Sequence, residues 1–288
     1  MGSEGYKWFL GIVEDLADPL QLGRVRVRIF AEHDDNIQTT DLPWAIVFMP
    51  PTSASLGSVG SSPNGLLVGS YVKGFYLDGA EKQFPAVDGT WHKIPNNDKD
   101  QHDVASLARG KNNIQKTLLG PEPDTPYAAQ YPHNKVLQTP SGHTIEMDDT
   151  PGHERIHIYH SSGTYAEINN NGRLVIKSAN DSFQITAGNN NVYVAGKANV
   201  HIEGSEDVYI GGNNDVTIHG NMTVDVTGAV SIRSGAAIAL SAPGGVTVSD
   251  GSLTVAGTVV ASRGATGTFT TPTGETVHVQ NGIITNIF

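Results

Sequence analysis

The clearest pattern along the chain is an eight-residue repeat in its second half. Glycines recur at every eighth position from 188 to 228, and an alternating apolar pair precedes each of the last five. Because the intervening positions are mostly polar, each octad predicts a short strand with two side chains inward and a glycine where the backbone turns or crowds. The repeat glycines are Gly188, Gly196, Gly204, Gly212, Gly220 and Gly228. The apolar pairs are Val192 with Val194, Val200 with Ile202, Val208 with Ile210, Val216 with Ile218, and Val224 with Val226.

One octad presents a single apolar face, and nothing in its own layer covers that face. Three chains would supply about 24 residues per layer, enough to enclose a narrow triangular core and to hide the strand edges. The repeat therefore predicts an obligate, intertwined homotrimer with a β-helix over residues 136–250. With strands about 4.8 Å apart, about fourteen octads give a stiff needle on the order of 65 Å long.

The first third of the chain follows a two-residue period instead. Residues 24–29 alternate arginine with valine or isoleucine, which is typical of a half-buried strand with its apolar side chains inward. Further short strand-like runs, without a convincing amphipathic helix, predict a small closed barrel of the OB type over residues 1–93. The pattern is lost over residues 94–135, which predict an exposed linker, and residues 251–288 predict a small C-terminal tip.

Composition and charge narrow the functional classes. The chain has 288 residues, of which 33 are glycine and none is cysteine, so disulfide scaffolds, thiolate metal sites and cysteine nucleophiles are excluded. A formal net charge of −11 disfavours a general affinity for nucleic-acid phosphates or anionic lipid. The expected fold class is all-β, with an OB-fold barrel, an intertwined homotrimeric β-helix of octapeptide repeats and a small tip.

Two parts of the sequence resemble one known family. Residues 8–15, which read Trp-Phe-Leu-Gly-Ile-Val-Glu-Asp, and the Asp-Pro-Leu-Gln-Leu-Gly-Arg-Val-Arg-Val-Arg run at 18–28 resemble the N-terminal OB domain of the central spikes of T-even-like contractile-tailed phages. Residues 141–143, 148–155 and 162–165 resemble the entry into that family's trimeric β-helix, a module shared with the VgrG spikes of type VI secretion.

The resemblance implies a structural spike on the central axis of the virion's tail baseplate. Its OB domain would dock on the baseplate hub trimer, and its needle would puncture the host outer membrane on sheath contraction. The family's lysozyme domain has no room here, because only residues 94–135 separate barrel and β-helix. No lytic or other enzymatic activity is therefore expected. The same device in a type VI secretion system or a tailocin is an alternative that the sequence leaves open.

Residues 153–157 read His-Glu-Arg-Ile-His, formally the zinc-peptidase motif, and His160 follows. That motif requires a helix, whereas Ile156 and Ile158 alternate with polar residues as in a strand. On a strand the two motif histidines would lie about 13 Å apart, too far for one metal ion. We interpret the motif as the polar face of a strand.

Two further patterns bear on ligands. Arg24, Arg26 and Arg28 form a basic stripe of the kind with which OB-folds bind single-stranded nucleic acid, but acidic residues crowd the same region and no stacking platform is evident. A solvated or protein-binding face is favoured, and no nucleic-acid partner is expected. The polar positions of the octads suggest a sugar-binding ladder, yet aromatic residues are absent from 210 to 268. A polysaccharide-binding or polysaccharide-degrading tail spike is therefore the less favoured alternative.

The tip contains one candidate metal ligand. Three copies of His278 would converge on the trimer axis if they faced inward, and three imidazoles can hold a metal ion. Some related spikes hold iron at the tip through a His-x-His pair, but here Gln280 stands in the second position. With the neighbouring valines inward, His278 faces outward, which is the favoured arrangement. No other cofactor is expected, and a PAAR-type tip protein is an open partner.

Overall fold

The protein is described from a computed structural model that covers residues 5–57, 59–61, 65–92, 123–259 and 264–288. Within those ranges the regular structure consists of β-strands and short 3-10 turns, so the chain is all-β as predicted. It divides into two units, residues 1–193 and 194–288. Residues 94–122 of the predicted linker lie outside the described ranges. Among the described residues, no helix has the length and apolar character that crossing a membrane requires.

The N-terminal strands close into a five-stranded barrel. Around the barrel they follow the order β1 (Lys7–Asp15), β2 (Val25–Ile29), β3 (Trp44–Val47), β5 (Pro85–Trp91) and β4 (Tyr71–Tyr76). Neighbours are antiparallel except β3 and β5, and the 3-10 turns η1 (Thr39–Asp41) and η2 (Gly79–Glu81) lie in the connections. A small closed barrel of this kind confirms the expected OB-type fold.

The barrel core follows from the two-residue period. Val25, Val27 and Ile29 of β2 are at most 2% exposed, while the arginines between them face outward. Gly74 of β4 allows the strands to approach closely, because a Cβ at that position would lie 2.1 Å from the carbonyl oxygen of Ala86. The barrel is therefore closed by small and β-branched residues packed at short range.

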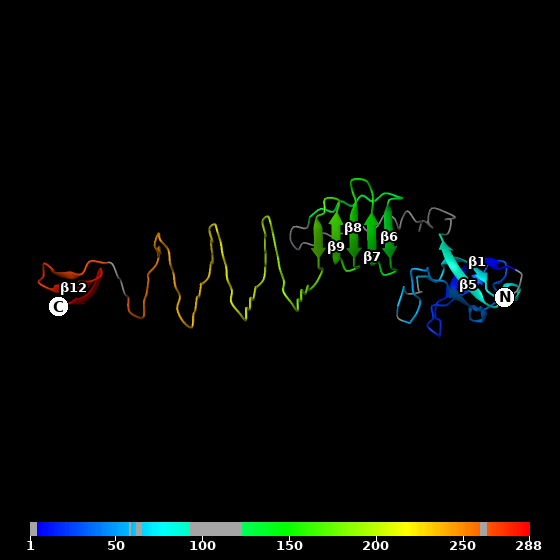
Figure 1. The fold of residues 1–288 in the computed structure, drawn as a ribbon, viewed down its shortest axis with the longest axis horizontal. Helices are drawn as coiled ribbons and strands as arrows, with labels where there is room; N and C mark the ends of the chain where they lie inside the picture. Colours follow the sequence, from blue (N-terminus) through cyan, green and yellow to red (C-terminus); the bar gives the residue numbers. More distant parts are fainter. Residues whose placement is uncertain (1–4, 58, 62–64, 93–122, 260–263) are drawn as a thin grey trace. The chain divides into compact units, whose positions relative to one another are not determined.

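The second sheet is a five-stranded antiparallel meander in the order β6 to β10, seen in green in Figure 1. Its strands are β6 (Asn134–Gln138), β7 (Thr144–Asp148), β8 (Arg155–Tyr159), β9 (Tyr165–Asn169) and β10 (Leu174–Lys177). Each of the four connecting loops places a glycine at positive φ, a conformation that other residues rarely adopt. These glycines are Gly142, Gly152, Gly163 and Gly172.

The octad segment keeps its eight-residue period in the backbone. Between residues 178 and 259 a single chain forms no strand, but it bends at 187–188 and again at every eighth residue through 235–236. In Figure 1 this part of the chain runs back and forth without a neighbouring strand beside it. One chain thus shows the turns of the predicted β-helix and not its strand pairing, so the homotrimeric β-helix over residues 136–250 stays a prediction.

The C-terminal tip is a three-stranded antiparallel sheet of β11 (Gly267–Thr270), β12 (Thr276–Gln280) and β13 (Ile283–Ile287). Its last two strands form a hairpin whose turn is Asn281-Gly282. Asn281 has φ 52° and Gly282 has φ 82°, as a tight turn with two left-handed residues requires.

Candidate functional site

The meander β6–β10 has one face that is apolar and open to solvent. Its register aligns apolar side chains in rows across the strands, with Ile156 opposite both Met147 and Ile168. Eight large side chains on this face are between 40% and 76% exposed. They are Leu137, Ile145, Met147, Ile156, Ile158, Ile168, Leu174 and Ile176. A contiguous apolar sheet face of this size indicates an interface rather than a free surface.

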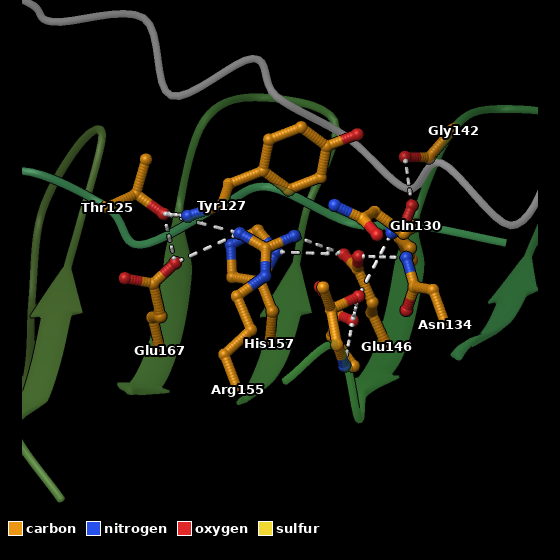
Figure 2. A network of polar contacts seen from close by, with 12 residues as sticks. Thr125, Tyr127, Gln130, Asn134, Gly142, Glu146, Arg155, His157 and Glu167 are labelled. Carbon is orange, nitrogen blue, oxygen red and sulfur yellow. Dashed lines mark hydrogen bonds and ion pairs between the residues drawn. The ribbon is translucent and has the colours of Figure 1, made fainter. Parts of the chain in front are cut away.

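The opposite face of the same sheet is polar and buried. Residues 123–133, which we call the strap, run across it, as Figure 2 shows for the labelled strap residues. The polar residues that this face and its loops bury are at most 5% exposed. They are Asn134, Thr144, Glu146, Asp148, Thr150, Arg155, His157 and Glu167. The single chain therefore inverts the usual arrangement, with polar side chains inside and apolar side chains outside.

A buried charge cluster lies at the centre of the polar face (Figure 2). Arg155 Nη2 is 2.7 Å from Glu146 Oε2, and Arg155 Nη1 is 3.1 Å from Glu167 Oε2. Asn134 Nδ2 donates to the other Glu146 oxygen at 2.6 Å. On the strap side, the ring of Tyr127 lies 4.5 Å from Arg155 Cζ. One guanidinium is thus held between two carboxylates and an aromatic face.

The electrostatics of Glu146 reflect this enclosure. Burial alone raises the pKa of the Glu146 carboxyl, but His157, Arg155 and Asn134 together hold that pKa below its usual value. The imidazole of His157 is fully buried, and its Nδ1 lies 3.6 Å from Glu146 Oε2, beyond hydrogen-bond distance. Glu146 is therefore held in its charged form although it has no access to water.

The His-Glu-x-x-His motif lies on this sheet and not on a helix, as the alternation predicts. His157 is on β8, whereas His153 precedes the strand and bonds through Nδ1 to the carbonyl oxygen of Pro126 at 2.9 Å. His160 follows the strand and stacks on His143 with ring centroids 4.3 Å apart. The described residues contain no cluster of metal ligands. The interpretation as a polar strand face is right about the strand but misses that this face is the buried one.

The octad pairs form a second open apolar surface, although the repeat predicts that both members of each pair point inward. The first members are 65–84% exposed in the single chain, and the second members are 47–50% exposed. The first members are Val192, Val200, Val208, Val216 and Val224. The second members are Val194, Ile202, Ile210, Ile218 and Val226. One chain therefore buries none of these ten side chains, because an octad has no neighbouring layer within its own chain to cover it. Their inward placement stays a prediction for an assembly of several chains.

The repeat glycines likewise make no close contact within the chain. At all six positions a Cβ would meet nothing within 4 Å in the same chain, and none of the six has positive φ. Each of these glycines lies at a bend of the backbone, as the repeat predicts, but neither crowding nor a positive φ within one chain requires glycine there. Contacts within a single chain thus explain neither the exposed apolar pairs nor the choice of glycine.

The outer face of the barrel carries the arginine stripe. Arg24 Nη2 is 2.7 Å from Asp18 Oδ1, and Arg28 Nε is 2.6 Å from Glu14 Oε1. Arg26 lies over the ring of Trp44, with Cζ 4.5 Å from its centroid, and donates to Thr39 O at 2.8 Å. The arginines are thus engaged by the barrel itself, which leaves little free positive charge for a ligand.

Another surface of the barrel, which the sequence reasoning missed, is aromatic. Phe75 contacts the rings of Tyr6, Trp8 and Phe48, with centroid distances between 4.8 and 5.7 Å. Tyr6, Trp8 and Phe48 are 47–59% exposed. We call these four residues the aromatic patch. The signal was present in β1, where Trp8 and Leu10 stand at outward positions, but their neighbours come from distant strands.

At the tip, β12 places its residues on alternate faces of the small sheet. Val277 is 3% exposed, while His278 faces the other way and meets the ring of Phe288 edge-on at 5.1 Å. The proposed convergence of three His278 copies on a metal ion stays a prediction. Metal analysis of the purified protein tests it: metal that His278→Ala removes supports the site, and metal that survives this substitution refutes it.

Comparison with known proteins agrees with this geometry. Residues 29–154 match the family described as the Gp5 N-terminal OB domain. Protein Gp5 of Vibrio phage KVP40 is 30% identical over 263 residues, covering 67% of this chain and 62% of that protein. The chain is thus similar to the Gp5 N-terminal OB domain family and to phage Gp5 proteins. The pre-baseplate central spike protein Gp5 of Enterobacteria phage T4 is 43% identical over 86 residues, covering 27% of this chain and 15% of its own length. This chain thus spans about three fifths of the KVP40 relative and far less of the T4 relative.

Proposed function

We propose that this protein is the structural central spike of a contractile-tail baseplate and punctures the host outer membrane when the sheath contracts. The observation that carries the proposal is the combination of a Gp5 OB domain with an octad segment whose apolar pairs are open in a single chain. In the virion the protein would lie on the central axis of the baseplate. Images of particles that carry a label at Phe288 test this placement, and label away from the leading end of the tail would contradict it.

The spike we propose is a homotrimer. The exposed face of β6–β10 and the octad pairs are both apolar surfaces of the same chain. Contact with other chains would remove both from water, which is favourable. Three copies closed around one axis would bury both surfaces and pair the octad strands, giving a prism that resists axial load. Light scattering on the purified full chain measures the mass directly. A monomer of 30.5 kDa would end the proposal.

Puncture without hydrolysis is the proposed mode of action. Residues 94–135 are too few for a lysozyme fold, so cleavage of peptidoglycan would be left to another protein. Purified spike is expected to release no soluble fragments from peptidoglycan or from host surface polysaccharide. Release of either product would replace the mechanical role with an enzymatic one.

The aromatic patch is the surface that we propose for docking on the baseplate hub. Exposed Trp, Tyr and Phe side chains are enriched at protein interfaces and anchor them. Of the lysines next to the patch, Lys73 pairs with Asp88 at 3.5 Å, and Lys7 lies 3.8 Å from Glu32, a carboxylate that it shares with Lys82. Because carboxylates partly offset those charges, an apolar protein surface fits the patch better than a phosphate-rich ligand.

The docking test compares two exposed aromatic residues of the barrel. Trp8→Ala is expected to weaken binding to the hub protein at least tenfold, because it removes a large anchor from the patch. Phe84→Ala is the control, since Phe84 is also 50% exposed but shares no ring contact with the patch. Equal binding by both variants would place the hub contact elsewhere on the protein.

A further inference from the structure

Charged side chains of β7, β8 and β9, rather than apolar ones, fill the small interior between the sheet and the strap. Apolar residues of similar volume often replace a buried ion pair without loss of stability, so the charges of Glu146, Arg155 and Glu167 suggest a directional role. Arg155 connects the two glutamates, because each of its two terminal nitrogens faces one carboxylate. The guanidinium is thereby fixed in position and orientation.

Two residues of the strap contact this fixed guanidinium. Arg155 Nη1 is 3.3 Å from Thr125 Oγ1, which itself donates to Glu167 Oε2 at 2.8 Å. The ring of Tyr127 lies over the same guanidinium, two residues further along the strap. Figure 2 shows Thr125 and Tyr127 on the strap side of Arg155. The first residues of the strap are thus attached to the sheet through the side chains of Arg155 and Glu167.

Additional contacts extend the attachment along the strap. His153 Nδ1 bonds to the carbonyl oxygen of Pro126 at 2.9 Å, and the backbone N–H of Gln130 donates to Thr150 Oγ1 at 3.0 Å. Arg173 donates through Nη2 to the carbonyl oxygen of Asp124. These bonds run from side chains of the sheet and its loops to the backbone of the strap, so they hold a segment that has no strand pairing of its own.

We propose that the strap is a clamp, in which Arg155, positioned by Glu146 and Glu167, grips Thr125 and Tyr127 and so fastens the chain that leaves the linker to the spike sheet. The clamp lies on the face opposite the open apolar face, so it works without competing with trimer contacts. Its existence depends only on this fold. That it carries axial load during contraction rests on the proposed function.

Hydrogen exchange on the full-length protein tests the clamp. Thr125→Val removes the bridging hydroxyl, and Tyr127→Leu removes the aromatic face over Arg155. Each is expected to speed amide exchange over residues 125–133 about tenfold, the effect of losing one such contact, while exchange in β7 and β8 stays unchanged. Tyr131→Leu is the matched control in the same segment, because Tyr131 is 64% exposed and should alter nothing.

Two outcomes would overturn the clamp. The first is unchanged exchange over residues 125–133 in both variants, which would mean that Arg155 does not hold the strap. The second is faster exchange in strap and sheet together, which would make the strap an ordinary part of the sheet's fold. Mass measurements on the same samples distinguish failure of the clamp from failure of the proposed function. A monomeric wild type would refute the trimeric spike, but it would not change what hydrogen exchange shows about the strap.

Discussion

Arg155 and Glu146 form an ion pair in which both side chains are fully buried, with Nη2 and Oε2 2.7 Å apart. On the same sheet, Lys135 Nζ and Asp149 Oδ2 are 2.9 Å apart, but these side chains are 68% and 62% exposed. The nitrogen–oxygen distances in the two pairs are nearly the same, but the first pair is buried and the second is exposed to solvent. In water the Lys135–Asp149 attraction is screened, whereas the buried guanidinium cannot be removed without leaving two carboxylates unpaired in the interior.

The first prediction compares these pairs by substitution. Arg155→Ala is expected to lower the free energy of unfolding by about 3–5 kcal/mol, because it strands the carboxylates of Glu146 and Glu167. Lys135→Ala should cost less than about 1 kcal/mol. Urea denaturation at one fixed protein concentration measures both, since the stability of an oligomer depends on concentration. Similar losses for the two variants would show that the cluster does not behave as a buried pair.

The second prediction concerns acid. The pKa of Glu146 is lower in the folded protein than the ordinary value of 4.5, so the unfolded chain binds a proton more readily at this residue. The stabilisation is therefore fully present above pH 4.5 and is lost as the pH falls through the lower, folded value. Thermal unfolding between pH 7 and pH 3 should show a falling midpoint in the acidic range.

Glu146→Gln serves as the control for this pH dependence. The amide keeps the shape of the side chain but does not titrate in this range, so the variant should lose part of the acid sensitivity even if it is less stable at pH 7. A midpoint that falls equally steeply in both proteins would assign the acid sensitivity to other carboxylates, of which the Arg24-bound Asp18, whose pKa is also lowered, is one.

The sequence predicts local periodic features well and tertiary pairings poorly. Alternation in residues 24–29 is enough to place valines inward, but it does not reveal that Glu14 and Asp18 engage the arginines. In β8 the same alternation separates Ile156 from His157 without telling which face is buried. Burial of the His157 face depends on the strap, which the local pattern does not encode.

The third prediction tests the octad alternation inside the proposed trimer. Ile210→Asp would place three carboxylates in one apolar layer, so it should convert the trimer to monomers or aggregates. Its neighbour Tyr209 is 94% exposed and stands at an outward position, so Tyr209→Asp should leave the trimer intact. Light scattering on both purified proteins decides the matter. Two trimeric variants would mean that the pair does not face a closed core.

The last prediction concerns the repeat glycines, for which two effects have opposite signs. In one chain a Cβ at Gly204 meets nothing within 4 Å and φ is not positive, so Gly204→Ala costs an isolated chain nothing locally. If no neighbour crowds the site, alanine should stabilise the protein by about 0.4–1 kcal/mol, because it restricts the unfolded chain. In a closed trimer we expect the backbone of another copy to approach this position, and alanine then destabilises the assembly. A lower melting temperature for Gly204→Ala than for the wild type supports a closed trimer. The control is Glu203→Ala at the adjacent, 79% exposed position, which should leave the melting temperature unchanged. A higher melting temperature for Gly204→Ala would show that closure does not require this glycine.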